Sequence, residues 1–351
     1  MYSFRNDYSE GAHPKVLQAL TDTNAQQTPG YGQDPFCARA ADTVRRLCRA
    51  PDAQVHFLAG GTQTNLITIE ALLKPFEAVI AAHTGHVNVH ETGAVEATGH
   101  KVCAVRSPDG KLTPDLAASV LAGHSTEHMV SPRLVYISNT TEIGTVYTRA
   151  ELSALRRFCT ENGLLLFLDG ARLGSAMAAG DVTWQDLPKI ADAFSIGGTK
   201  NGALFGEALV LPSPRPDFRR HMKRRGGMLA KGRLLGVQFQ ALLQDGLYLE
   251  IARHENAMAL RLRDGMAALG YAFPVESVSN QQFPVVPNRV MEALQTMGYE
   301  FEIDGPVDAD RTRIRLVTSW ATPEEAVDRF LRDLREIGDA EEIGNSERER
   351  R

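Results

Sequence analysis

Short apolar runs alternate with amphipathic stretches from about residue 53 to residue 211. Several runs are almost continuously apolar, as buried parallel strands are. The stretches between them carry apolar residues at three- and four-residue spacing, which indicates helices over 113–123 and 149–163. The pattern therefore predicts an α/β fold with a mostly parallel sheet covered by helices. The predicted strands span 53–59, 78–82, 101–105, 133–138, 164–169, 193–198 and 206–211.

The pattern changes after residue 232. One or two long helices are predicted as far as about residue 265, followed by shorter strands and helices that are typical of a smaller α+β domain. The predicted strands here are 281–286, 299–303 and 312–317, and the helices are 288–297 and 323–337.

These patterns divide the chain into three parts. We expect a large domain over residues 15–245 and a small C-terminal domain over residues 246–338, which the N-terminal segment 1–14 joins. Residues 339–351 are almost entirely charged or small and polar, so we expect a disordered tail.

The composition of the chain argues against several classes of protein. The chain has 351 residues, 43% hydrophobic and 23% charged, with a formal net charge of −5, which is ordinary for a globular protein and gives no sign of a nucleic-acid partner. It lacks an N-terminal apolar leader and any run of about 20 apolar residues, so we expect a cytoplasmic protein without a membrane partner. The four cysteines form no CxxC pair, which argues against a zinc site or disulfide framework.

Two polar residues follow apolar strands. Asp169 ends the run FLD and is placed to reach a ligand beyond the carboxyl end of a strand, although a helix-capping role is an equally good interpretation. Lys200 lies between glycines in GGTKNG, where partial burial lowers the pKa of an amine and makes it a nucleophile. An exposed loop lysine is the simpler interpretation of Lys200 taken alone.

Two further motifs add to this picture. Gly61 and Thr62 lie in a turn before a helix that begins near Gln63, and such a turn favours a phosphate, although many of these turns bind nothing. His83, His86 and His90 form a histidine cluster. No companion ligand set stands out, so we expect no metal, and one imidazole is suited to stack on an aromatic cofactor.

Together these features match what pyridoxal 5'-phosphate (PLP) requires: an amine, an anion for the ring nitrogen, a phosphate turn and a stacking partner. Their order along the chain favours a PLP fold resembling aspartate aminotransferase (fold type I). A dinucleotide-binding GxGxxG and a GxxxxGK[ST] phosphate loop are both missing.

The chain resembles the L-threonine aldolases of the β-eliminating lyase group, including low-specificity and phenylserine-type enzymes. The resemblance extends over nearly the whole chain. It rests on FRNDYSEGAHP (4–14), YGQDP (31–35), GGTQTN (60–65), HVNVHETGA (86–94), NTTEIGTVY (139–147), LDGARL (168–173), GGTKNG (197–202) and RIRLVTSW (313–320).

The resemblance implies roles for the cofactor site. Lys200 matches the Schiff-base lysine, Asp169 the partner of the ring nitrogen, and Gly61 with Thr62 the phosphate turn. His86 matches the stacking histidine, because the family has a glutamate five residues later and here that residue is Glu91.

The resemblance also implies a substrate site. Arg172, which borders the cofactor as well, and Arg315 match the arginines that bind the substrate carboxylate, a task suited to a bidentate donor. Asn6 stands where many relatives carry serine. Tyr31 matches an aromatic residue near the active site. Lys231 is our candidate for the cation that the family places near the phosphate of an adjacent subunit. For the basic stretch around Lys231, a solvated helix face is an equally good interpretation. These roles imply a homodimer or homotetramer with active sites at the subunit interface.

The implied reaction is PLP-dependent cleavage of L-threonine, L-allo-threonine or phenylserine-type β-hydroxy-α-amino acids to glycine and an aldehyde. His86 is the natural candidate for the base. The alternative is another PLP-dependent lyase, aminotransferase or racemase on the same fold. A cofactor-free binding protein is a more distant alternative, because a scaffold needs none of Lys200, Asp169, Arg172 and Arg315.

Overall fold

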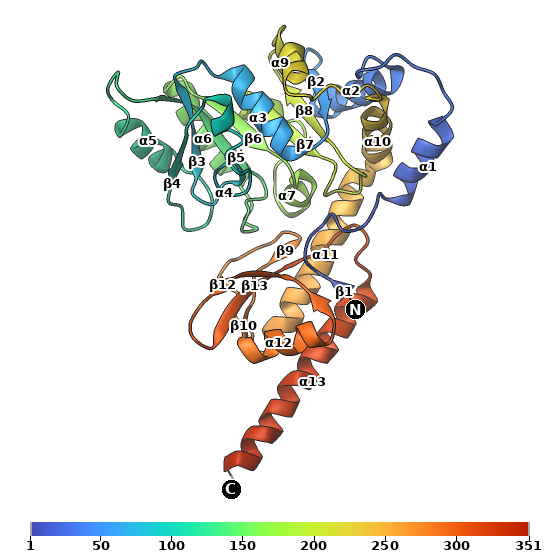
Figure 1. Cartoon of the computed structure of the whole chain (residues 1–351), viewed down its shortest axis with the longest axis vertical. Coiled ribbons are helices and arrows are strands. Elements are labelled where there is room, and N and C mark those ends of the chain that lie inside the picture. The colour runs from blue at the N-terminus through green and yellow to red at the C-terminus, as the bar shows by residue number, and fades with distance from the viewer. Residues whose placement is uncertain (1, 350–351) are drawn as a thin grey trace.

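The computed structural model describes residues 2–349, with side chains as far as residue 338. Figure 1 shows a large α/β domain and a smaller C-terminal domain, joined by the long helix α11 (Leu247–Ala268). The amino end of α11 packs in the core of the large domain through Leu247 and Ile251, and its carboxyl half packs in the small core through Leu262 and Met266. The helix therefore belongs to both cores, and our division at residue 245 stays a proposal.

All seven strands predicted for the large domain are present, and they form one sheet in the order β2-β8-β7-β6-β5-β3-β4. Strands β3 to β7 run parallel, whereas β8 is antiparallel to both neighbours because a hairpin loop, not a crossover helix, joins β7 to β8. The strands are β2 (Gln54–Leu58), β3 (Glu77–Ala82), β4 (Val102–Val105), β5 (Ser131–Ser138), β6 (Leu165–Asp169), β7 (Ala193–Gly197) and β8 (Glu207–Leu211).

Both faces of this sheet are covered by helices, which explains the continuous apolar runs. Along β5, Val135 and Ile137 enter one core while Leu134 and Tyr136 enter the core on the other face. The first face is covered by α1 (Pro14–Thr23), α2 (Pro35–Cys48), α5 (Pro114–Ala122), α6 (Arg149–Glu161), α7 (Leu173–Ala179), α8 (Leu187–Ile190) and α10 (Arg233–Leu243), and the second by α3 (Gly61–Leu72), α4 (His86–Val89) and α9 (Phe218–Arg224).

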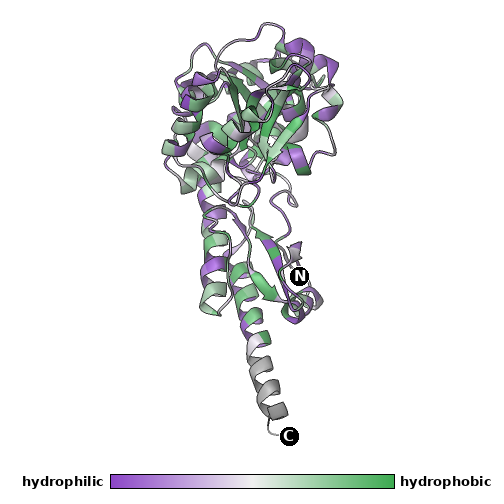
Figure 2. Cartoon of the chain, turned by 90° about the vertical axis from the view of Figure 1, so that its left-hand side faces the viewer, coloured by the Kyte–Doolittle hydropathy of each residue, from purple (hydrophilic) through white to green (hydrophobic). Residues whose placement is uncertain are grey.

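The N-terminal segment and the C-terminal third of the chain make up the small domain. Strand β1 (Tyr2–Ser3) pairs in parallel with β11 (Tyr299–Glu300), and Phe4 lies in the same core. In the four-stranded sheet β13 (Arg311–Val317) pairs antiparallel with β9 (Gln281–Gln282), β10 (Val285–Pro287) and β12 (Glu302–Pro306). Helices α12 (Asn288–Thr296) and α13 (Glu324–Glu349) complete the domain, and green apolar strands beside α11 mark its core in Figure 2.

The backbone of α13 is helical to Glu349, where we expected residues 339–351 to be disordered. Helix propagation costs less than nucleation, and this segment is rich in the helix-forming residues glutamate and arginine, so a helix begun on the small domain can continue. The last two expected tail residues lie outside the described part of the chain.

The structure also bears on the cysteines and on membrane-spanning helices. All four cysteines are buried free thiols. No helix among residues 2–349 is both long and apolar enough to cross a membrane.

Candidate active site

A cavity of about 350 Å³ lies at the carboxyl ends of β5, β6 and β7, where Tyr8 of the N-terminal segment also lines it. It is lined by residues from six separate segments, which the parallel sheet brings to one edge. Ten residues were assigned to the cofactor or substrate site from the sequence, and six of them line this cavity: Gly61, Thr62, His86, Asp169, Arg172 and Lys200.

Lys200 lies in the hairpin loop between β7 and β8. The backbone N–H groups of Gly198 and Thr199 donate to the carbonyl of Gly206 at 2.9 and 3.1 Å, and the Gly206 N–H donates to the Thr199 hydroxyl at 2.9 Å. Gly206 has a φ of +116°, and an added Cβ would meet Leu235 at 2.4 Å, so only glycine suits this closure. Burial and the charge of Arg172 lower the pKa of the Lys200 amine.

Asp169 is buried at the end of β6 and accepts three hydrogen bonds. The Tyr136 hydroxyl and the Asn65 amide donate to Oδ2 at 2.6 and 2.9 Å, and the Ala171 N–H donates to Oδ1 at 2.9 Å. The following helix, α7, has Arg172 at its N-cap position and no side-chain capping bond, so Asp169 is not its cap. A buried carboxylate with three donors is suited to face a cationic group.

His86 is linked to Asp169 through a short chain of side chains. Its Nδ1 lies 2.8 Å from Oε1 of the buried Glu91, and the Asn65 amide donates to that same oxygen at 2.7 Å as well as to Asp169. Asn65 and Tyr136 were missed in the sequence, although Asn65 ends the motif GGTQTN. Only their packing reveals their part in the site.

The turn between β2 and α3 is open towards the cavity. Gly60 is the N-cap of α3 and makes no side-chain capping bond, and a Cβ added to Gly60 or Gly61 would meet no described atom within 4 Å. The backbone N–H groups of the first turn and the helix dipole favour an anion here, and Thr62 adds a hydroxyl.

Two acidic residues in the cavity were missed in the sequence: Glu142 lies in the motif NTTEIGTVY, and Glu207 begins an apolar run in GEALVL. Glu142 accepts from the Ser138 hydroxyl at 2.6 Å and from the backbone N–H of His86 at 2.9 Å, and burial raises its pKa. Burial and the charge of Asp169 raise the pKa of Glu207 to about 8. Among the described residues, no group forming three or more metal ligands is found.

Arg172 is held by Asp7 of the N-terminal segment. Its Nε and Nη2 donate to the two carboxylate oxygens at 2.6 and 3.1 Å, and Asn280 of the small domain donates to Asp7 at 2.9 Å. Burial raises the pKa of Asp7, but the charges of Arg172 and Lys200 and these hydrogen bonds outweigh it and lower the pKa overall. Asp7 therefore joins three distant segments beside the cavity.

Arg315 and Asn6 lie near this cluster without lining the cavity. Burial and the charge of Arg172 lower the pKa of Arg315, and its buried Nε has no hydrogen-bond partner among the described residues. Two neighbouring guanidinium groups favour a carboxylate ligand. Oδ1 of Asn6 accepts from the Tyr8 N–H at 2.9 Å and the Ser9 hydroxyl at 3.0 Å and so stabilises a turn.

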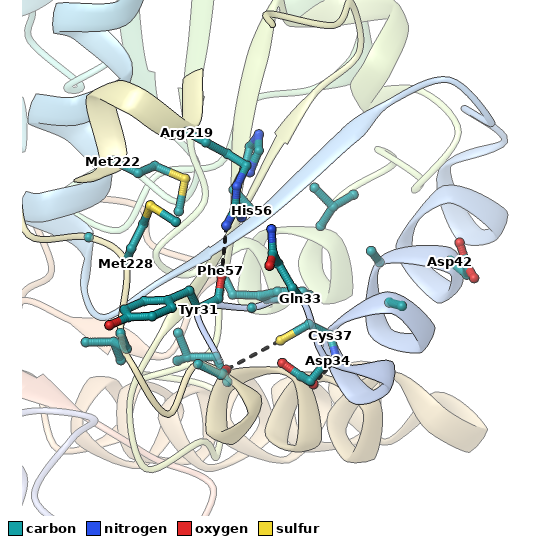
Figure 3. A pocket seen from close by; sticks show the side chains of 18 of the residues that line it. Tyr31, Gln33, Asp34, Cys37, Asp42, His56, Phe57, Arg219, Met222 and Met228 are labelled. Atoms are coloured by element: carbon teal, nitrogen blue, oxygen red, sulfur yellow. Dashed lines mark hydrogen bonds between the residues drawn. The ribbon is translucent and has the colours of Figure 1, made fainter. Parts of the chain in front are cut away.

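Tyr31 and Lys231 lie away from the Lys200 cavity of their own chain. Figure 3 shows Tyr31 at a second cavity of about 270 Å³, where the Arg219 guanidinium donates to its carbonyl at 3.0 Å. Lys231 is exposed and borders a third cavity with Ala230. Within a single chain neither residue reaches the cofactor site that we expected them to serve.

Comparisons with known proteins agree with the fold. Residues 4–288 match the family model described as Beta-eliminating lyase. The low specificity L-threonine aldolases of a Pseudomonas species and of Pseudomonas aeruginosa are 34% and 33% identical, each over 95% of this chain and 97% and 96% of their own lengths.

Solved structures extend the comparison. The threonine aldolase of Leishmania major superposes with a TM-score of 0.95 and 47% identity over 96% of this chain and 99% of its own. An aspartate aminotransferase of Thermus thermophilus superposes with a TM-score of 0.69 at 16% identity over 94% of this chain and 90% of its own, which confirms the predicted fold class. The chain therefore belongs to the β-eliminating lyase family, on the fold of the PLP-dependent aminotransferases.

Proposed function

We propose that this protein uses PLP to cleave β-hydroxy-α-amino acids such as L-threonine, L-allo-threonine and phenylserine to glycine and an aldehyde. One observation carries the proposal. The cavity brings Lys200, Asp169 and Arg172 together in a chain that superposes almost completely on the threonine aldolase of Leishmania major.

The residues of the cavity fit PLP. Lys200 supplies an amine of lowered pKa, Asp169 a buried anion for the ring nitrogen, and the open turn at Gly61 and Thr62 a phosphate site. When bound, PLP supplies a protonated aromatic ring that accepts the electron pair of the broken Cα–Cβ bond. Asp169 keeps that ring nitrogen protonated, because an adjacent carboxylate favours the cationic form.

The arginines orient the substrate. Arg172 and Arg315 bind the substrate carboxylate, with Asn6 as a neighbouring polar group. The orientation that they impose determines which bond at Cα is positioned to break. Asp7 limits the motion of Arg172 because it already engages two of the guanidinium nitrogens. A precise orientation is needed because the same cofactor supports several bond cleavages.

His86 is suited to accept the proton of the substrate β-hydroxyl as the Cα–Cβ bond breaks. Glu91 accepts from Nδ1, and we infer from this hydrogen bond that Nε2 carries the free electron pair. The buried carboxylate also stabilises the imidazolium that forms when Nε2 takes the proton.

Replacing His86 separates its two roles. His86→Phe keeps an aromatic ring against the cofactor but removes the base, so we expect cofactor absorbance to persist while kcat for L-threonine falls by about 10²–10⁴. The measurement is steady-state kinetics together with the absorption spectrum. A matched control, His83→Phe, alters a histidine that does not line the cavity and should leave kcat near the wild-type value. Unchanged turnover in His86→Phe would remove His86 from proton transfer.

Product analysis with L-threonine tests the proposed reaction. Aldol cleavage yields glycine and acetaldehyde in equal amounts, and the reverse reaction of glycine with benzaldehyde yields phenylserine. Formation of 2-oxobutanoate without acetaldehyde would show elimination in place of aldol cleavage. The Lys200→Ala variant serves as the control for nonenzymatic products.

We also infer a cytoplasmic homodimer or homotetramer with active sites at subunit interfaces. Support comes from Tyr31 and Lys231, which match cofactor- and substrate-site residues of the family but lie outside the Lys200 cavity of their own chain. The same residues would then serve the cavity of a neighbouring subunit. A monomer in light scattering that retained full activity would contradict this inference.

A further inference from the structure

Glu207 lies directly beside the turn that precedes α3. It is the first residue of β8 and pairs with Leu58, the last residue of β2 before that turn. Side chains alternate along a strand, so Glu207 shares a face with Leu209 and Leu211, whose core includes Ile67 of α3. The carboxyl group therefore lies on the α3 side of the sheet, in the cavity that Gly61 lines.

The environment of Glu207 disfavours a carboxylate next to the phosphate of a bound cofactor. The residue is 5% exposed, and its Oε2 has no hydrogen-bond partner within the described chain. Burial and the charge of Asp169 outweigh the hydrogen bonds from Thr199 and Gly198 and disfavour the charged form of Glu207. A cofactor phosphate is a dianion at neutral pH because its second pKa is about 6. A proton held between the Glu207 carboxyl group and the phosphate would relieve the repulsion between these two groups.

The charged and titratable groups facing Glu207 come from several elements. Lys200 lies in the adjoining loop, Asp169 at the end of β6, and Tyr248 on α11, where its hydroxyl donates to the carbonyl of Gly197 at 2.9 Å. Arg172 and His86 line the same cavity. The first turn of α3 has no acidic residue. The Lys200 amine is committed to the cofactor carbonyl in the proposed function, so it is not a lasting partner for Glu207.

We propose that Glu207 is protonated in the holoenzyme and donates a hydrogen bond from its carboxyl group to the phosphate of PLP. The inference rests on the cofactor named in the proposed function and adds a phosphate ligand beyond the turn and Thr62. A carboxylic acid that donates to an anion forms a short, strong bond and satisfies the oxygen that is otherwise unpartnered.

The pKa of Glu207, raised to about 8 by burial and by Asp169, agrees with this geometry. A bound phosphate raises the pKa of the donating carboxyl further. Cofactor affinity is then at its maximum below about pH 8, where Glu207 is already protonated. Above this pH the affinity declines by up to about tenfold per pH unit, because the free enzyme must take up a proton when the cofactor binds. The enzyme should therefore lose its cofactor more readily at alkaline pH.

Phosphorus-31 NMR of the holoenzyme tests the inference without measuring activity. We expect the resonance of bound PLP to shift with pH above about 8 in the wild-type protein. Glu207→Gln is the matched variant, because its amide still donates to the phosphate but does not titrate in this range. Its resonance should stay constant over the same pH range, and its cofactor affinity should match that of the wild type at pH 7.

A second variant tests the donor itself. Glu207→Ala removes the hydrogen bond, and we expect equilibrium dialysis at pH 7 to show about tenfold weaker binding of pyridoxine 5'-phosphate, which forms no bond to Lys200. Identical phosphorus-31 titrations of the wild type and Glu207→Gln would overturn the inference, as would loss of cofactor from Glu207→Gln or unchanged affinity in Glu207→Ala. Failure of the wild-type protein to bind PLP at any pH would instead overturn the proposed function and the inference with it.

Discussion

Lys200→Ala is expected to lower the rate of L-threonine cleavage at least about a thousandfold, because covalent catalysis is lost with its nucleophile. The amine lies in the hairpin loop between β7 and β8, in the cavity that Asp169 and Arg172 also line, and among the described residues no other lysine lines that cavity. The measurement is acetaldehyde release under saturating PLP. Lys189→Ala is a suitable control, because Lys189 is exposed on α8 and does not line the cavity.

Chemical trapping tests the same residue independently of turnover. The purified protein should be yellow, and borohydride should bleach it and attach a pyridoxyl group to the peptide that contains Lys200. The Lys200→Ala protein should acquire no such label. A label on a different lysine in the wild-type protein would overturn the assignment.

Asp169→Asn has the second largest expected effect, a decrease in kcat of at least about a hundredfold. Asparagine preserves the shape but loses the negative charge, and its amide presents a donor where Tyr136, Asn65 and Ala171 already donate. The ring nitrogen would then lose the anion that keeps it protonated. Steady-state kinetics with L-threonine provide the measurement.

Tyr136→Phe is the matched control for Asp169→Asn. It removes one of three hydrogen bonds to the carboxylate but keeps its charge, so we expect only about a tenfold decrease in kcat. If Asp169→Asn were no more damaging than Tyr136→Phe, the charge of Asp169 would not be the important property, and its assignment to the ring nitrogen would fail.

The sequence by itself predicted the fold class, which the comparisons confirm, and proposed Lys200 and Asp169, which the structure brings to one cavity. Short apolar runs predicted all seven strands of the large sheet, and several are almost continuously apolar because strands buried on both faces need apolar residues at nearly every position. Lys200 and Asp169 were proposed from their order with the phosphate turn and His86 and from the family resemblance. Both line one cavity, because the ends of neighbouring parallel strands meet at one edge of the sheet. The local sequence pattern therefore predicts the fold class and the candidate residues.

Only the tertiary structure could reveal the partners of these residues. Asp7 meets Arg172 across 165 positions of sequence, and Asn65 meets Asp169 across 104, so no local pattern connects them. Glu207 reads as the start of an apolar strand in GEALVL, and its proposed role depends on the antiparallel pairing with Leu58 that places it beside the α3 turn. The sequence determined which residues could do the chemistry, whereas long-range packing decided which groups hold them, since burial and hydrogen bonding depend on neighbours brought together by folding.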